Sequence, residues 1–154
     1  MKYDTSRFGT LALPDDKIIH FPDGLYGFEG EKKFALLPFD PNIESPMEWL
    51  QSLKTPGLAF VVTDPFLFVP NYKVVTTVDE RQRLKMNERS EVKIRAIVTI
   101  PEIYTEMTAN LVAPLVINTD AMIARQVVLT TLEYDTRQFL LPESSRQSKA
   151  NAAN

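Results

Sequence analysis

The chain has 154 residues, of which 44% are hydrophobic and 24% charged, the balance of one globular domain with its own core. It contains no cysteine and one histidine, which excludes a disulfide framework, thiolate metal ligands and cysteine nucleophiles. The net charge of −3 is uneven: residues 1–80 carry 12 acidic and 7 basic side chains, and residues 81–154 carry 8 and 10. The acidic half disfavours non-specific nucleic-acid binding and favours a basic partner.

Short apolar runs and period-two patterns, interrupted by proline and glycine, predict an all-β (mostly β) single domain with a barrel-like or roll-like fold. Residues 92–100 alternate apolar positions with Lys93 and Arg95, which predicts a half-buried strand. Asp79 is expected to cap a short helix over residues 80–85. In chain order, the expected strands cover residues 6–13, 17–21, 34–38, 58–63, 72–78, 92–100, 115–118, 126–132 and 138–141.

A second short helix is predicted between two of these strands. Ser45, followed by proline and by Glu48, has the spacing of a capping box with proline at the first helical position. The helix would continue through residues 49–53 and carry Trp49, the only tryptophan, into the core beside Leu50. An exposed position for Trp49 is the alternative.

The ends of the chain and one turn set further limits. Residues 22–30 form a glycine-rich turn, but the glycine spacing matches neither the P-loop nor the dinucleotide fingerprint. Residues 143–154 are polar and are expected to form a disordered tail after a domain of residues 1–142. No apolar run approaches the roughly 18–20 residues of a membrane helix, and the first residues lack the apolar core of a signal peptide. We therefore expect a cytoplasmic protein without a membrane partner.

The sequence offers little for catalysis. His20 has no serine partner in a Gly-x-Ser-x-Gly elbow, and a position on the outward side of a strand is expected for it. With one histidine and no cysteine, only an oxygen cage could hold a metal ion, and no calcium-loop motif occurs. We predict no enzyme activity, no metal site and no cofactor.

Aromatic residues are concentrated in one presumed loop, residues 64–72, which we call the aromatic loop. Phe66, Phe68 and Tyr72 are the first candidates for partner binding, because aromatic anchors dominate many interfaces. The alternative is that the loop folds back over one end of the barrel and belongs to the core.

Two asparagines are the second candidates. Asn110 and Asn118 bracket an Ala-Pro pair in a segment that has few charges. The alternative role for both is turn formation, in which their side chains close Asx turns.

Several segments in a fixed order carry a family resemblance. They include Asp-Gly-Leu-Tyr-Gly-Phe-Glu at 23–29 and Ile-Val-Thr-Ile-Pro at 97–101. The most specific is Thr-Ala-Asn-Leu-Val-Ala-Pro at 108–114. On these residues, the chain over residues 5–142 resembles the bacterial flagellar assembly factor FliW family. One departure is Ala124, near a position where family members tend to have glycine before the last core strand.

The resemblance implies a single β-barrel-like or roll-like domain and a chaperone-like, partner-switching function. FliW proteins bind flagellin and, as a second partner, the RNA-binding translational regulator CsrA. Free FliW occupies CsrA and lifts its repression of flagellin translation, whereas accumulated flagellin captures FliW and releases CsrA. The implied partners are proteins, with no direct nucleic acid, and we expect a monomer.

Two other classes stay open at this point. A small β-barrel that binds nucleic acid would need a basic groove with stacking aromatics, and the charge distribution disfavours it. A ligand-binding barrel or small hydrolase would need a deep pocket with a perturbed ionisable group.

Overall fold

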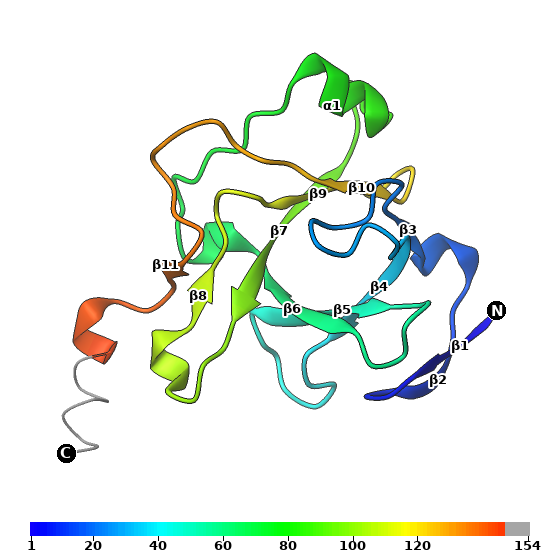
Figure 1. Cartoon of the computed structure of the whole chain (residues 1–154), viewed down its shortest axis with the longest axis horizontal. Coiled ribbons are helices and arrows are strands. Elements are labelled where there is room, and N and C mark those ends of the chain that lie inside the picture. The colour runs from blue at the N-terminus through cyan, green and yellow to red at the C-terminus, as the bar shows by residue number, and fades with distance from the viewer. Residues whose placement is uncertain (147–154) are drawn as a thin grey trace.

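The computed structural model describes residues 1–146, which form a mostly β fold with short helical segments (Figure 1). The predicted fold class is confirmed. The helical segments are the 3-10 helices η1 (Asp15–Lys17), η2 (Pro65–Leu67) and η3 (Tyr104–Glu106) and the helix α1 (Val78–Arg83). The strands are β1 (Lys2–Thr5), β2 (Gly9–Ala12), β3 (Ile19–His20), β4 (Lys33–Pro38), β5 (Met47–Ser52), β6 (Ala59–Thr63), β7 (Val92–Thr99), β8 (Thr108–Ala109), β9 (Leu115–Asn118), β10 (Ile123–Gln126) and β11 (Gln138–Phe139).

The main sheet closes on itself through β7. Its order is β11-β8-β7-β6-β5-β4-β3-β10-β9, and β9 pairs with β7 as well as with β10. The pairings from β7 through β6, β5, β4, β3, β10 and β9 therefore return to β7, and these strands surround the core (Figure 1). Strands β3 and β10 pair in parallel, whereas the other pairs are antiparallel. This closed circuit gives the barrel-like arrangement that the sequence predicts.

Alternate residues of these strands fill the interior. Phe34, Leu50 and Ile117 are buried in one cluster, contributed by β4, β5 and β9. The rings of Phe21 and Phe34 meet edge to face with centroids 5.2 Å apart. Because successive side chains of a strand point to opposite faces, the neighbours of these residues lie outside the ring.

Two further clusters cover the outer faces. Ala96, Val98 and Val116 belong to a cluster under the segments that precede α1 and follow β10. Ile18, Ala35 and Leu53 form a smaller cluster against Tyr3 and Leu13, so the β1–β2 hairpin covers the outside of β3, β4 and β5.

The predicted helix over residues 49–53 is wrong, because this segment is strand β5. Met47–Ser52 pairs antiparallel with β4 on one side and β6 on the other. The Ser45 hydroxyl accepts the N–H of Met47 at 3.1 Å, so it closes a turn before a strand instead of capping a helix. Backbone pairing on both edges outweighs a local capping signal, which is worth only about 1 kcal/mol.

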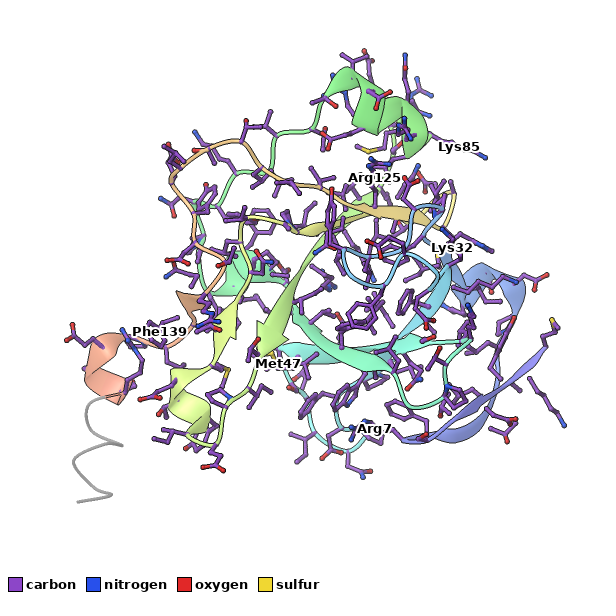
Figure 2. The ribbon with its side chains drawn as sticks, in the orientation of Figure 1. Arg7, Lys32, Met47, Lys85, Arg125 and Phe139 are labelled. Carbon is purple, nitrogen blue, oxygen red and sulfur yellow. The ribbon has the colours of Figure 1, made fainter. Side chains whose placement is uncertain are left out.

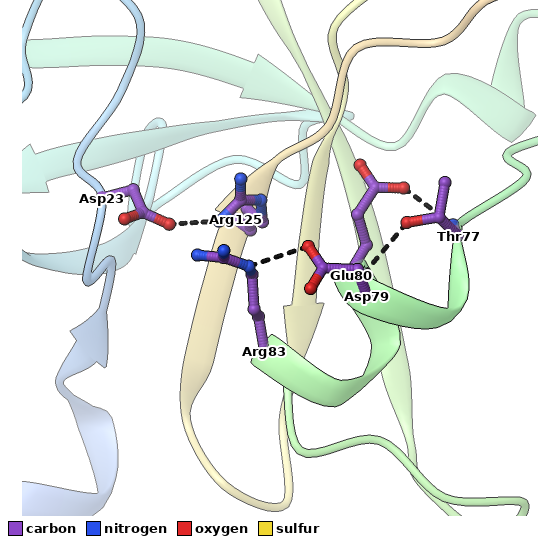
Figure 3. A network of polar contacts seen from close by, with 6 residues as sticks. All are labelled: Asp23, Thr77, Asp79, Glu80, Arg83 and Arg125. Carbon is purple, nitrogen blue, oxygen red and sulfur yellow. Dashed lines mark hydrogen bonds and ion pairs between the residues drawn. The ribbon is translucent and has the colours of Figure 1, made fainter.

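Other predicted elements shift or disappear. Residues 6–13 form the turn and second strand of a hairpin that begins at Lys2. Residues 72–77 form no strand, and the helix that follows is capped by Thr77 instead of Asp79, with a capping box between Thr77 and Glu80 (Figure 3). The strand predicted at 126–132 is wrong, because the strand in this region is β10 (Ile123–Gln126) and ends where the predicted one begins. The strands predicted at 34–38, 58–63, 92–100 and 115–118 are confirmed within one residue.

Ala124 lies within β10, and the preceding turn contains Met122 with φ 53°, a left-handed conformation that glycine usually supplies.

The predicted tail, residues 143–154, lies outside the described residues from 147 onward. Its described part forms a helical turn, in which the Arg146 guanidinium lies 3.7 Å from the centre of the Phe139 ring.

The turn at residues 22–30 depends on one glycine. Gly24 is buried, has φ 65° and would place a Cβ atom 2.6 Å from backbone atoms of Phe28 and Glu29. Gly27 also has a positive φ, 86°, but no atom beyond its two chain neighbours lies within 4 Å of its hypothetical Cβ. A Cβ atom at Gly24 would therefore cause both a backbone clash and backbone strain, whereas a Cβ atom at Gly27 would cause strain alone.

We predict that Gly24→Ala lowers the free energy of unfolding by about 3 kcal/mol, because strain and a backbone clash add. Gly27→Ala, the matched control, should lower it by about 1 kcal/mol through strain alone. Urea denaturation followed by circular dichroism measures both. Equal losses in the two variants would contradict the assigned clash.

A polar cluster holds the end of β5 to the segment before β4. The Ser52 hydroxyl donates to Glu31 Oε2 at 2.7 Å, and the Thr55 hydroxyl donates to the other carboxylate oxygen. Burial acts to raise the pKa of Glu31, but the bonds from Thr55 and Ser52 and the charge of Lys54 together hold it below its ordinary value.

Because the pKa of Glu31 is lowered by folding, its stabilising contribution is present above the unfolded-state pKa and is lost as pH falls through the folded-state pKa. We predict that Glu31→Gln lowers the free energy of unfolding by about 1 kcal/mol at about pH 7. The difference from the parent chain should shrink as pH falls through the lowered folded-state pKa of Glu31, because the protonated glutamate then carries no charge, as glutamine does. Urea denaturation across this pH range is the measurement, with exposed Glu133→Gln as the control. A difference that stays constant with pH would contradict the assignment.

Candidate protein-binding site

The aromatic loop, residues 64–72, divides into an outward and an inward part. Asp64 caps the 3-10 helix η2 by accepting the N–H of Phe66 at 3.0 Å, and proline follows at the first helical position. Phe66 is 39% exposed and Leu67 is 62% exposed, whereas Phe68 packs against the outer core cluster. The outward part of the loop is therefore Phe66 and Leu67.

Tyr72 ends the loop inside the protein. Its side chain is 3% exposed, and its hydroxyl donates to the carbonyl oxygen of Leu111 at 2.6 Å. Burial raises the pKa of Tyr72, and the neighbouring Tyr134 raises it further, so the hydroxyl keeps the proton that it donates. Tyr72 anchors the loop to the segment between β8 and β9. A partner contact through Tyr72 stays a prediction.

Asn110 and Asn118 both close turns. The side-chain oxygen of Asn110 accepts the N–H groups of Val112 and Ala113, each at 3.1 Å. Asn118 is 1% exposed, and its side-chain oxygen accepts the N–H of Asp120 at 3.1 Å. Its amide also donates to the carbonyl oxygen of Leu84 at 2.9 Å. This is the turn chemistry given as the alternative for both residues. Partner binding by them stays a prediction.

Beside the outward part of the aromatic loop, the structure contains a groove that no sequence pattern predicted. Its volume is about 750 Å³, and the loop between β4 and β5 forms much of its wall. We call it the β4–β5 groove. It is lined by Leu36, Pro38, Phe39, Asp40, Pro41, Asn42, Ile43, Glu44, Ser45, Pro46, Met47, Glu48, Asp64, Leu67 and Arg95.

The β4–β5 groove combines exposed apolar groups with negative charge. Phe39, Ile43 and Leu67 are 36%, 65% and 62% exposed. The ionisable side chains of the lining are four carboxylates and one guanidinium. That guanidinium belongs to Arg95, which is paired with Glu48 at 2.6 Å. Apolar surface with a polar rim is typical of protein-binding surfaces.

Trp49 lies beside this groove and is half-buried, so the expectation that it belongs to the core is not met. Its ring stacks on Phe39, with centroids 5.2 Å apart and an interplanar angle of 8°. Arg7 lies at the turn of the β1–β2 hairpin (Figure 2). Its guanidinium is 3.9 Å from the centre of the Trp49 ring. The hairpin and the β4–β5 loop thus meet through one tryptophan.

A second, smaller hollow of about 420 Å³ lies at the glycine-rich turn. Tyr26, 60% exposed, is held there by its backbone N–H, which donates to Gln126 Oε1 at 2.9 Å. The ion pair of Asp23 and Arg125 lies at the same place (Figure 3). Because its charges are mixed, this hollow has no clear preference for the charge of a ligand.

The remaining sequence expectations concern chemistry and membranes. His20 is exposed, as predicted for the outward side of a strand. Within residues 1–146, no three acidic or histidine side chains come together in the way a metal ion would require. No helix in this part of the chain has the length and apolar character needed to cross a membrane.

The division of the aromatic loop gives a direct test. We predict that Phe68→Ala lowers the free energy of unfolding by about 2 kcal/mol, because it leaves a hole beside the outer core cluster. Leu67→Ala should change it by less than about 0.5 kcal/mol, because its side chain is mostly in solvent. Thermal and urea denaturation measure both, and similar losses would show that the loop has no outward part.

Comparison with known proteins agrees with the fold. The sequence model described as FliW protein matches residues 2–140. The flagellar assembly factor FliW of Desulfitobacterium hafniense is 42% identical, over 94% of this chain and 93% of its own length. That of Bdellovibrio bacteriovorus is 45% identical, over 99% of this chain and 86% of its own. A crystal structure of the flagellar assembly factor FliW matches with a TM-score of 0.84 and 34% identity, covering 93% of this chain and 99% of that one. The chain belongs to the FliW family of flagellar assembly factors.

Proposed function

We propose that this chain is a cytoplasmic, non-enzymatic regulator that binds flagellin and antagonises the translational regulator CsrA by partner switching. The observation that carries the proposal is the extent of the family match, which covers residues 2–140 and includes the segment at 108–114. A second support is the exposed apolar surface of the β4–β5 groove, because such surfaces on small domains commonly bind proteins.

Partner switching requires only that flagellin and CsrA disfavour each other on this chain. If flagellin binds the chain, the free chain available to CsrA falls by mass action, and CsrA returns to its RNA targets. If flagellin leaves the cytoplasm, the chain is free to occupy CsrA. Overlap of the two sites or coupling between them gives the same direction of response.

The five partner-binding residues predicted from the sequence would have different roles in this function. Phe66, beside exposed Leu67, would contact a partner directly. The other four would act by holding the surface in shape, because their side chains pack inward or close turns: Phe68, Tyr72, Asn110 and Asn118.

The charge of the groove weighs against the nucleic-acid-binding alternative. A groove that tracks a phosphate backbone needs basic side chains, whereas the β4–β5 groove has four carboxylates and one paired guanidinium. An acidic surface also suits a basic, RNA-binding partner and would repel the RNA which that partner binds.

The proposal predicts the outcome of a three-component reconstitution. The immobilised chain should retain purified CsrA, and added flagellin should release it, because both bind at the expense of the other. In a gel-shift assay the chain should reduce RNA binding by CsrA, and flagellin should restore it. The chain alone should shift no RNA.

Resin without the chain is the control for retention. Failure of the chain to retain either flagellin or CsrA would refute the proposal. Simultaneous retention of both, without mutual release, would refute partner switching and leave protein binding in place.

A further inference from the structure

We propose that the β4–β5 groove docks a cationic, amphipathic segment of a partner protein, in which lysine or arginine flanks aliphatic or aromatic side chains. The inference deepens the proposed function and rests on it only for the premise that the ligand is a protein. It names the chemistry of the segment that the groove selects.

The β4–β5 groove carries an excess of negative charge. Asp40, Glu44, Glu48 and Asp64 line the groove with Arg95, so three negative charges have no opposite charge within the lining. Hydrogen bonds from backbone N–H groups to Asp40 and Asp64 orient these carboxylates without neutralising them. A cationic segment is therefore attracted to the groove, and an anionic one is repelled.

Glu44 is the carboxylate most available to a ligand. It is exposed, and within residues 1–146 its side chain has no hydrogen-bond or ion-pair partner. Glu48, by contrast, is held by Arg95 at 2.6 Å. A lysine or arginine from a partner can reach Glu44 without displacing an existing contact.

The β4–β5 groove also presents apolar surface. Ile43 comes from the β4–β5 loop and Leu67 from η2, so two separate elements supply exposed aliphatic groups to one groove. A purely charged ligand would leave these groups in water, whereas burial of an aliphatic side chain against them is favourable. The combination selects an amphipathic segment over a simple polycation.

The β4–β5 loop is restrained before any ligand binds. Three prolines of the lining restrain the β4–β5 loop: Pro38 ends β4, and Pro41 and Pro46 lie within the loop. The Asp40 carboxylate accepts the N–H of Asn42 at 2.9 Å, and the Asp40 carbonyl accepts that of Ile43 at 3.3 Å. A loop restrained in this way loses little conformational entropy when a ligand docks.

The single tryptophan provides a reporter of occupancy. Trp49 stacks on Phe39, which lines the groove. A ligand that contacts Phe39 should alter the surroundings of the indole and therefore its fluorescence. No label is needed on the protein.

We predict that a short synthetic peptide of alternating lysine and leucine binds the full chain and changes the Trp49 fluorescence in a saturable manner. A peptide of alternating glutamate and leucine should not. Glu44→Lys should weaken binding of the lysine–leucine peptide by about tenfold, and Ile43→Ser by about fivefold, because charge and apolar contact both contribute. Added salt should weaken the binding of the parent chain.

Two matched variants control for position. Glu133→Lys makes the same charge change at an exposed residue outside the groove lining, and Leu132→Ser removes a fully exposed aliphatic group outside it. Both should leave peptide binding within about twofold of the parent chain. The charge at residue 133 is screened by salt, and the side chain at residue 132 lies outside the contact. Equal weakening by Glu44→Lys and Glu133→Lys would overturn the inference, as would a peptide that does not bind.

The same variants separate this inference from the proposed function. If flagellin and CsrA bind the parent chain and also bind Glu44→Lys and Ile43→Ser unchanged, the groove is not their docking site and the inference fails, while the proposed function stands. If neither protein binds the parent chain, the proposed function fails, and peptide binding decides the groove chemistry by itself. Unchanged melting temperatures of the variants establish that any loss is a loss of contact.

Discussion

The architecture depends on how the chain from 108 to 118 runs along one edge of β7. At one end of this edge, β8 pairs with Val98 and Thr99, and at the other, β9 pairs with the stretch from Val92 to Arg95. Between β8 and β9 the chain leaves the edge at Asn110, whose own N–H still donates to the carbonyl of Ile97. We call residues 110–114, which leave the edge, the excursion. Because of it, the same edge of β7 pairs with β9, which closes the ring, and with β8, which pairs in turn with β11.

An excursion from a sheet leaves backbone groups that need partners, and here each neighbouring segment supplies some. The Asn110 side chain accepts two N–H groups within the excursion. Tyr72 donates to the Leu111 carbonyl, and the N–H groups of Val127 and Leu129 donate to the carbonyls of Pro114 and Val112. The segment with the strongest family resemblance is therefore the point where the aromatic loop and the segment after β10 attach to the barrel.

Sequence patterns predicted the parts of this fold that rest on local burial. Strand β9 was predicted with its observed bounds, because Pro114 precedes a short apolar run rich in β-branched residues, Val116 and Ile117. Strand β5 was mistaken for a helix, because Ser45 and Glu48 have capping-box spacing and the two pairing partners that decide its conformation lie elsewhere in the chain. The β4–β5 groove could not be predicted, since its lining joins residues near 40 with Leu67 and Arg95. A mild signal was Ile43, a large aliphatic residue in a polar segment rich in proline.

The stack of Arg7, Trp49 and Phe39 has a consequence for local stability. The β1–β2 hairpin is a separate two-stranded sheet, held to the barrel by a small apolar cluster and by the Ser6 N–H, which donates to the Pro56 carbonyl at 2.9 Å. Segments with few such contacts open at lower free energy than the whole domain unfolds. Detachment of this hairpin would remove Arg7 from the indole and loosen one side of the β4–β5 groove while the barrel stays folded. Local opening of the β1–β2 hairpin is therefore coupled to the stability of the β4–β5 groove.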